Sequence, residues 1–505
     1  MLEASLSSLA AYGLGFYLSY IAALVFHRFF FHPLAHIPGP QLAGATYLYE
    51  WYYDLYLCGQ FTFKLKEIHK KYGPVVRINP DYVHINDPDY FGEIYNQSNG
   101  RVDKPSRVAK AFGPYPAVIG TQSHELPRIR RGALNPFFSK KSVNDLFHVM
   151  CRPIDILCKR LDKACKTGET LNMKYMYAAV AQDIINDYCF ATGPEYVLKP
   201  DFGRKSFDDV DSFVEISLIN IHIPWLIHLS YSLPDRVIKY LTPALADILD
   251  FRKDISRQVE NIRDGKDKSY ENAGHRTLIH ELLQSKLPPN ELKRDRLRDE
   301  AFNTVKTGSG TIALTLREIA YHIAADQAIR QRLYNELRVA IPDPSKPPFL
   351  HELEQLPYLS AVIKEGLRLC NPITHRIGRQ FPDKSFNCHG YVIPAGSDLG
   401  MTAYLIHLNE DIYPEPMAFK PERWLEQGKR LERYLVPFSG GPRACLGNNL
   451  ARAELFLILA LVFRQFDFDV SRVSRERDID FSRDFLVAGQ ARDSPGILVK
   501  VKRVC

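Results

Sequence analysis

The sequence contains no CxxC pair, and its nine cysteines are spread along all 505 residues. An odd number of cysteines without that spacing argues against a disulfide framework and a structural zinc site, and it predicts reduced thiols facing the cytosol. No internal repeat, low-complexity tract or Gly/Ser-rich linker occurs after Pro40. The absence of linkers predicts one large folded domain rather than a string of small ones.

A strong excess of one charge is also missing. The chain has 65 Lys and Arg residues against 58 Asp and Glu residues, which gives a net charge of +7. This excess is too small for a dedicated nucleic-acid-binding protein, so we expect no nucleic-acid partner and at most a local basic face. Hydrophobic residues make up 46% and charged residues 24% of the chain, a balance that excludes wholesale disorder.

The N-terminal segment lacks charge altogether. No Asp, Glu, Lys or Arg lies between Glu3 and Arg28. As a helix, residues 4–26 would span roughly 34 Å at about 1.5 Å per residue, enough to cross a bilayer. Basic residues follow the apolar stretch rather than precede it, which favours an uncleaved anchor over a signal peptide. We therefore predict a membrane anchor over residues 1–30, a proline-rich hinge over 31–40 and a folded catalytic body over 41–505.

Helical periodicity dominates the rest of the chain, over residues 141–205, 295–341 and 352–369. Strand-like runs are short, and they cover Val75–Asn79, Val83–Asn86, Gly390–Ile393 and Ile497–Val501. These patterns predict a mainly α fold with small β-sheets. The apolar run Glu454–Phe463 is too short to span a membrane, so we predict a buried core helix there.

Residues Phe438–Gly447 (FSGGPRACLG) form the most informative stretch. Its three glycines and one proline exclude regular secondary structure, whereas the residues that follow predict a long helix. Cys445 therefore precedes a helix N-terminus, where backbone N–H groups and the helix dipole stabilise a thiolate. A thiolate is a strong ligand for iron, and the glycines let the backbone approach a flat group. We predict that Cys445 binds a metal and that the other eight cysteines are inert.

The fixed positions of the pattern FxxGxRxCxG are all present, as Phe438, Gly441, Arg443, Cys445 and Gly447. With them the chain resembles the cytochrome P-450 superfamily of haem-thiolate monooxygenases. The resemblance implies a single haem domain of that type behind an N-terminal transmembrane helix. It also implies haem b as cofactor, with Cys445 as the axial ligand and Phe438 shielding its sulfur.

Upstream, KEGLRL supplies Glu365 and Arg368, the ExxR pair of the family, and PERW supplies Arg423. Residues at i and i+3 share a helix face, so Glu365 and Arg368 can form an ion pair, and Arg423 can reach the same carboxylate. If exposed, such a pair would contribute little to stability. The resemblance implies instead a buried structural lock behind the haem.

In the family, basic residues pair with the haem propionates, and the candidates here are Arg443, Arg379 and Arg131. An arginine offers the two parallel N–H donors that a carboxylate prefers. The family often has Trp four residues before the last of these, where this chain has Pro127. Arg130 and His124 are therefore the alternatives to Arg131.

Residues Asn303–Leu314 (NTVKTGSGTIAL) correspond to the family's long helix on the distal side of the haem. Thr311 is retained, and the resemblance implies that its hydroxyl directs protons to bound dioxygen. The usual acid before it is Gly310, so water, Ser309 or Thr307 would complete the proton relay. Two glycines in a helix, each costing roughly 1 kcal/mol relative to alanine, predict a groove or kink at this place, or else close helix packing.

The favoured function is insertion of one oxygen atom from dioxygen into a hydrophobic small molecule, by hydroxylation, epoxidation or multistep oxidation. FHPLAHIPGP and ALNPFFSK resemble filamentous fungal members that tailor terpenoids, polyketides or related secondary metabolites. Because Gly310 replaces the acid, a haem-dependent isomerase, dehydratase or oxidative rearrangement enzyme is the alternative. A second alternative is a non-catalytic haem protein that binds a lipid or senses a gas.

The resemblance also implies partners and a location. Electrons would come from NADPH-cytochrome P-450 reductase or a cytochrome b-type donor, docked on a basic face of Arg128, Arg130, Arg131, Lys140 and Lys141. The single-pass anchor would lie in the endoplasmic reticulum membrane with the catalytic domain in the cytosol, and the hydrophobic substrate would arrive through membrane lipid. Five segments would line the substrate site: 101–120, with Phe112, Tyr115 and Val118 at its roof, and 213–229, 303–311, 372–377 and 485–489. His375 would bind a polar group of the substrate or be a satisfied buried histidine.

Overall fold

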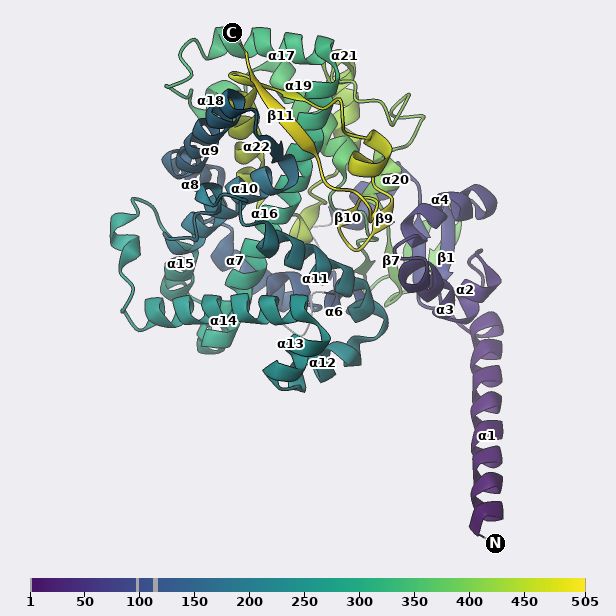
Figure 1. Cartoon of the computed structure of the whole chain (residues 1–505). Coiled ribbons are helices and arrows are strands. Elements are labelled where there is room, and N and C mark those ends of the chain that lie inside the picture. Colours follow the sequence, from purple (N-terminus) through teal and green to yellow (C-terminus); the bar gives the residue numbers. More distant parts are fainter. Residues whose placement is uncertain (1, 97–99, 112–116, 505) are drawn as a thin grey trace. The chain divides into compact units, whose positions relative to one another are not determined.

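The structure is a computed structural model that describes residues 2–96, 100–111 and 117–504. The chain forms two compact units (Figure 1). Unit 1 comprises Met1–Pro105 and Arg376–Thr402, and unit 2 comprises Ser106–His375 and Ala403–Cys505. The fold is mainly helical with small sheets, as the sequence predicts.

Unit 1 contains one long helix, several short ones and the largest sheet of the described chain. Its helices are α1 (Leu2–Phe30), α2 (Gln41–Ala45), α3 (Leu48–Trp51), α4 (Phe61–Tyr72) and α5 (Phe91–Tyr95). Its strands are β1 (Val75–Asn79), β2 (Tyr82–Ile85), β4 (Arg379–Gln380), β5 (Phe386–Cys388), β6 (Tyr391–Ile393) and β7 (Asp398–Gly400). The main sheet has the order β1-β2-β7-β4, with β2 and β7 parallel and the other two pairs antiparallel. β5 and β6 form a separate hairpin.

Helix α1 is the one helix of the described chain that is long and apolar enough to cross a membrane, judged by length and composition. Its apolar part, Ser7–Phe30, has a mean hydropathy of 1.7 and is not buried against the rest of the protein. The end of α1 is fixed to the body of unit 1, because Arg28 Nη1 donates to Ala45 O at 2.6 Å and Arg77 Nη1 donates to Arg28 O at 2.9 Å.

The proline-rich residues 31–40 pack against the first strand of the sheet. Leu34 and Ile37 are buried, and the Arg77 N–H donates to Pro38 O at 2.8 Å. Gly39 approaches this strand so closely that a Cβ there would lie 2.3 Å from Arg77 O. Only glycine fits at this distance, so the sequence of the hinge is matched to the strand on which it rests.

Unit 2 holds most of the helices. They are α6 (Ser106–Lys110), α7 (Glu125–Leu134), α8 (Lys140–Asp145), α9 (Phe147–Thr167), α10 (Met173–Phe190), α11 (Arg204–His222), α12 (Pro224–Ser232), α13 (Asp235–Leu241), α14 (Pro243–Arg263), α15 (Leu278–Gln284), α16 (Arg294–Ala325), α17 (Gln327–Ala340), α18 (Leu350–Leu353), α19 (Pro357–Cys370), α20 (Ala403–His407), α21 (Glu422–Leu431) and α22 (Asn448–Phe463). The strands are β3 (Thr170–Asn172), β8 (Phe466–Asp469), β9 (Arg483–Asp484), β10 (Ala488–Gly489) and β11 (Leu498–Arg503). They form a sheet of order β3-β11-β8 and a β9–β10 pair.

The periodic stretch 141–205 is not one continuous set of helices. Helix α9 ends at Gly168, which adopts a left-handed conformation with φ of 71°, and the short strand β3 then pairs with β11. Glycine adopts this conformation without steric cost, which explains the break. Asn172 starts α10 by accepting the N–H of Lys174 on its side chain.

Helix α16 is the longest element of unit 2, with 32 residues, and it contacts α10, α14 and α19. Gly308 marks its contact with α10, since a Cβ at this position would lie 3.0 Å from Ile185 Cγ1. Helix α22 is buried from Ala453 to Phe463, which confirms the predicted core helix over its C-terminal part.

Candidate active site

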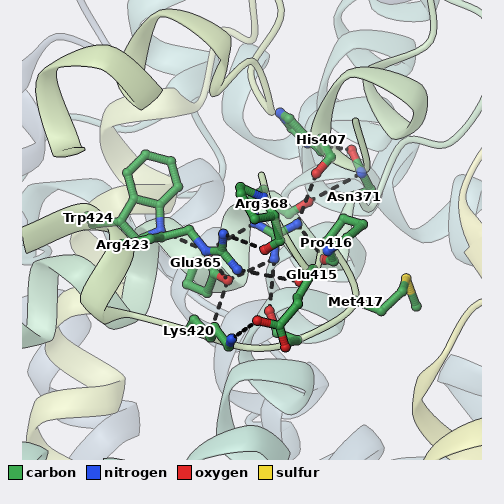
Figure 2. Close-up of polar contacts among 12 residues, drawn as sticks. Glu365, Arg368, Asn371, His407, Glu415, Pro416, Met417, Lys420, Arg423 and Trp424 are labelled. Carbon is green, nitrogen blue, oxygen red and sulfur yellow. Dashed lines mark hydrogen bonds and ion pairs between the residues drawn. The ribbon is translucent and has the colours of Figure 1, made fainter. Parts of the chain in front are cut away.

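The ExxR helix α19 and the PERW segment meet at one buried carboxylate (Figure 2). Arg368 donates to both oxygens of Glu365, from Nε to Oε2 at 3.0 Å and from Nη2 to Oε1 at 2.8 Å. Arg423 Nε donates to Glu365 Oε1 at 3.1 Å, and the Lys420 N–H donates to the same oxygen at 2.9 Å. The indole N–H of Trp424 donates to Glu365 Oε2 at 2.8 Å. Five hydrogen bonds therefore stabilise a carboxylate that is 0% exposed.

Sequence reasoning missed Trp424, although it directly follows Arg423 in the PERW segment. A buried indole requires a hydrogen-bond acceptor, and the remaining acceptor capacity of a buried carboxylate nearby is the signal that points to this contact.

The second role of Arg368 is to fix the chain that follows. Its Nη1 donates to His407 O at 2.9 Å and to Pro416 O at 2.7 Å, and its Nη2 donates to Ala418 O at 3.2 Å. The guanidinium also lies 5.1 Å from the centre of the Tyr413 ring. One buried arginine thus holds three backbone carbonyls of the segment that leads to α21.

The Cys445 loop is closed on itself and leads directly into a helix. The Cys445 N–H donates to Phe438 O at 2.8 Å, which closes the loop. Gly441 adopts a left-handed conformation with φ of 62°, and Ser439 does so with φ of 57°. Helix α22 begins three residues after Cys445, and a Cβ added at Gly447, which precedes this helix, would meet nothing within 4 Å. The loop therefore leaves open space on the side of Gly447.

Cys445 is the one exposed cysteine among those that the structure describes. Its side chain is accessible to solvent, yet protein surrounds it deeply enough that burial raises the pKa of its thiol. The Gly447 N–H and the charge of Arg131 act in the opposite direction on this pKa, because both stabilise the thiolate. A thiol with these neighbours fits the thiolate ligand of an iron-containing group.

The predicted propionate-binding arginines have different surroundings. Arg443 is held by three backbone carbonyls ahead of α7, those of Thr121, Gln122 and Ser123, at 2.7 to 2.8 Å. Arg131, on α7, donates to Ala444 O at 2.8 Å and so lies beside Cys445. Arg443 and Arg131 therefore join the Cys445 loop to α7.

Arg379 belongs to unit 1, where it lies on β4. It is buried, its Nη1 donates to Gly378 O at 3.0 Å, and its guanidinium lies 4.7 Å from the centre of the Tyr95 ring. Burial lowers the pKa of Arg379.

Arg130 does not contribute to an exposed basic face. It is 4% exposed and makes two hydrogen bonds to Glu291, at 2.7 and 3.1 Å, and one to Thr121 Oγ1 at 2.7 Å. Its position in the RIRR segment on α7 explains this, since neighbouring residues face different sides of a helix. Arg128, Lys140 and Lys141 are exposed as expected.

Helix α16 has one accessible face. The residues on it are all partly or fully accessible to solvent, and we call the set the open face: Asn303, Lys306, Thr307, Gly310, Thr311 and Leu314. Thr311 Oγ1 donates to Thr307 O at 3.0 Å and Thr307 Oγ1 donates to Asn303 O at 2.7 Å. A Cβ at Gly310 would meet nothing within 4 Å, so this glycine leaves open space beside Thr311.

Ser309 points elsewhere. It is 4% exposed, and its hydroxyl donates to Gln182 Oε1 of α10 at 2.8 Å. The structure therefore places Thr311, Thr307 and Gly310 together on the open face and leaves Ser309 on the opposite side, against α10. The two glycines also differ, since Gly308 allows close helix packing whereas Gly310 borders the open face, and α16 continues through both without a break.

His375 is a partnered buried histidine. Its Nδ1 lies 3.2 Å from Asp484 Oδ2, and Thr374 Oγ1 donates to Asp484 Oδ1 at 2.9 Å. Phe112 and Tyr115, expected at the roof of the substrate site, lie outside the described residues.

Comparison with known proteins agrees with this arrangement. Residues 49–493 match the cytochrome P-450 family. A cytochrome P-450 monooxygenase of Cochliobolus heterostrophus is 39% identical over 95% of each chain. A tryptophan 6-hydroxylase of Fusarium equiseti is 35% identical over 95% of this chain and 94% of its own length. A conidiogenone synthase of Penicillium rubens is 34% identical over 97% of this chain and 98% of its own length.

The names of the first two relatives are those of oxygen-inserting enzymes, and the relatives do not favour an isomerase or a silent haem protein. The family uses haem with an axial cysteine thiolate, takes electrons from a redox partner and acts on hydrophobic substrates. The chain therefore belongs to the cytochrome P-450 family and is a haem-thiolate monooxygenase.

Proposed function

We propose that Cys445 is the axial haem ligand of this monooxygenase. The observation that carries the proposal is the accessible thiol of Cys445, which receives the Gly447 N–H and lies beside Arg131 on a loop that leads into α22. Gly447 leaves room for the flat ligand, and resemblance to the family supports the parts of Gly441 and Phe438. When bound, the haem supplies the activation of dioxygen.

The other residues hold this site in place. Glu365, Arg368 and Arg423 form the structural lock, and Arg443 and Arg131 join the loop to α7. Arg131 and Arg379 are the proposed partners of the haem propionates. The position of Arg131 beside the Cys445 loop supports its part, and resemblance to the family supports that of Arg379.

On the open face, Thr311 is the proposed proton-positioning residue. Its hydroxyl is oriented by Thr307 O, and the space left by Gly310 admits a water where the family has an acid. Thr307 is a second hydroxyl on the same face. Ser309 has no part in this relay, because its hydroxyl is bonded to Gln182.

The carbon monoxide difference spectrum of the reduced holoprotein tests the ligand. We expect the Soret shift that a thiolate ligand gives, and we expect Cys445→Ala to abolish it while the control Cys165→Ala, on α9, retains it. A thiolate-type spectrum that survives Cys445→Ala would contradict the assignment.

The finer biological assignment is also a proposal. We infer a single-pass protein of the endoplasmic reticulum membrane with an anchor at 1–30, a hinge at 31–40 and a cytosolic catalytic body at 41–505. Its electron donor is NADPH-cytochrome P-450 reductase, with a cytochrome b-type donor as the alternative. The docking face would contain the exposed Arg128, Lys140 and Lys141.

The substrate is a hydrophobic secondary metabolite, of the terpenoid, polyketide or a related class, that reaches the enzyme through membrane lipid. Helix α12 supports this route, since Trp225, Leu226 and Leu229 are 64%, 37% and 49% exposed. A cluster of exposed apolar side chains on one short helix is suited to contact with lipid.

A further inference from the structure

Lys306 is a cation on the open face whose role the catalytic site does not explain. It lies one helical turn before Gly310 on α16, and its side chain is half-buried. Its Nζ lies 4.0 Å from the centre of the Phe251 ring on α14, and Phe251 in turn packs against Phe302 at 5.9 Å between ring centres. The ammonium group thus lies over an aromatic ring at the border between α14 and α16.

This ammonium group lacks a full counter-charge. Lys306 forms no ion pair with any residue in the described part of unit 2. Burial lowers the pKa of Lys306 to about 8, and the charge of Asp209 on α11 acts in the opposite direction. Asp209 is itself beside Asp247. Burial raises the pKa of Asp209, and the negative charge of Asp247 raises it further. A partly desolvated cation with only a ring face as a close partner gains more from an added anion than an exposed lysine does.

Lys306 lies on the same face of α16 as Gly310 and Thr311. Residues four apart lie one above the other on a helix, so Lys306 is next to Gly310, and Thr311 follows Gly310 on the open face. A Cβ added at Gly310 would meet nothing within 4 Å, so the helix surface beside Thr311 is open. A molecule that extends along the open face from Thr311 therefore lies on the same side of α16 as Lys306.

We propose that Lys306 binds a carboxylate of an otherwise hydrophobic substrate that lies along the open face of α16. The inference rests on the proposed function, because it takes the open face as one wall of the haem site. Phe251 and Phe302 supply the apolar surface beside the charge, and the flexible lysine stem lets the ammonium turn from the ring towards the anion.

The test uses the full-length holoprotein and matched ligands that differ in one charge. The probes are dodecanoic acid, indole-3-propionic acid and abietic acid, each compared with its own methyl ester, and binding is followed by the change in the haem Soret spectrum. Lys306→Met removes the charge and keeps the stem, Lys306→Arg keeps the charge, and Lys159→Met is the control on an exposed lysine of α9.

We expect the wild type to bind at least one acid about tenfold or more tightly than its ester, as a charge-assisted hydrogen bond in a partly buried site would give. The preference should fall to about one in Lys306→Met and persist in Lys306→Arg and Lys159→Met. An acid-to-ester ratio that is the same in the wild type and in Lys306→Met, including no preference in either, overturns the proposal and leaves Lys306 as a packing residue over Phe251.

Failure of the proposed haem site would be visible separately. A protein that gives the thiolate-type carbon monoxide spectrum but shows no charge preference contradicts only the carboxylate inference. Loss of that spectrum in the wild type contradicts the haem site itself.

Discussion

Glu365 connects segments of the chain that are far apart in the sequence. Its carboxylate accepts hydrogen bonds from four residues, three of which lie more than fifty positions further along the chain. A buried charge is tolerated only when it is paired and hydrogen-bonded, and each donor lost leaves an oxygen partly unsatisfied. Residue spacing predicts the contact of Glu365 with Arg368, whereas the Trp424 contact depends on how α21 folds back onto α19.

Trp424→Phe tests the value of the indole contact. The substitution keeps most of the ring but removes the N–H that donates to Glu365 Oε2 at 2.8 Å. We expect the free energy of unfolding to fall by about 1–3 kcal/mol, the cost of leaving a buried acceptor unsatisfied. Urea denaturation in detergent, followed by far-UV circular dichroism, measures it.

The matched control for this substitution is Trp225→Phe, since Trp225 is 64% exposed on α12. We expect a change of less than about 0.5 kcal/mol there. Equal effects of the two substitutions would show that the Trp424 hydrogen bond does not stabilise the lock.

At the scale of elements, local patterns predict what depends on neighbouring residues and miss what depends on packing. Strand β1 coincides with the predicted run Val75–Asn79, because its alternation and its bounding residues are local signals. The sequence alone does not distinguish the roles of Gly308 and Gly310, because it does not show which residues pack against each of them. The structure separates them, with Gly308 against Ile185 and Gly310 on the open face.

Alanine substitutions at these two glycines should have opposite effects on stability. Gly310→Ala adds a methyl group in open space, so we expect the free energy of unfolding to rise by about 0.5–1 kcal/mol through helix propensity. Gly308→Ala places a Cβ 3.0 Å from Ile185 Cγ1, and Ile185 is only 1% exposed and cannot move freely. We therefore expect a loss of about 1–3 kcal/mol from overpacking.

Thermal unfolding of the two variants in the same detergent measures this difference. Stabilisation by both alanines would mean that α10 and α16 are less tightly packed at Gly308 than the distances indicate. Destabilisation by both would mean that the open face is filled at Gly310.

Across the whole molecule, the site is predictable where a short motif carries its residues and unpredictable where distant segments meet. The Cys445 loop and the ExxR helix are contiguous patterns, so their residues can be identified without knowledge of the fold. Lys306 contacts Phe251, and Gly39 packs against Arg77. The residues of each pair are more than thirty positions apart. Such contacts follow from the arrangement of helices and strands, which one sequence does not specify residue by residue.

Both units also contain histidines that are buried in the neutral form. Burial lowers the pKa of His69 to about 4, and burial and Arg368 lower that of His407 to about 3. The partners of His407 agree with this form, since its Nε2 accepts the Val436 N–H at 2.9 Å while its Nδ1 lies 2.9 Å from Asn371 Oδ1. Protonation of Nε2 would break the bond to Val436.

The sign of the pH dependence follows from these shifts. An unfolded histidine binds a proton near pH 6.5, and His407 in the folded protein binds it only near pH 3, so between these values the unfolded state holds more protons. The contribution of His407 to stability is therefore complete above about pH 6.5 and is lost as the pH falls, by up to about 1.4 kcal/mol per pH unit. Buried Glu318, whose pKa is raised by burial to about 8, contributes with the opposite sign between its unfolded value and pH 8.

Because these contributions oppose one another, the difference between two variants is the informative quantity. We expect the free energy of unfolding of His407→Gln to fall less steeply between pH 7 and pH 5 than that of the wild type, by roughly 1 kcal/mol per pH unit. Glutamine retains a donor and an acceptor for Asn371 and Val436 but does not titrate. His148→Gln, on an exposed histidine of α9, is the control and should keep the wild-type slope. Urea denaturation at a series of pH values measures the free energy of unfolding of all three proteins. Equal slopes for His407→Gln and the wild type would mean that His407 is not held neutral in the folded protein.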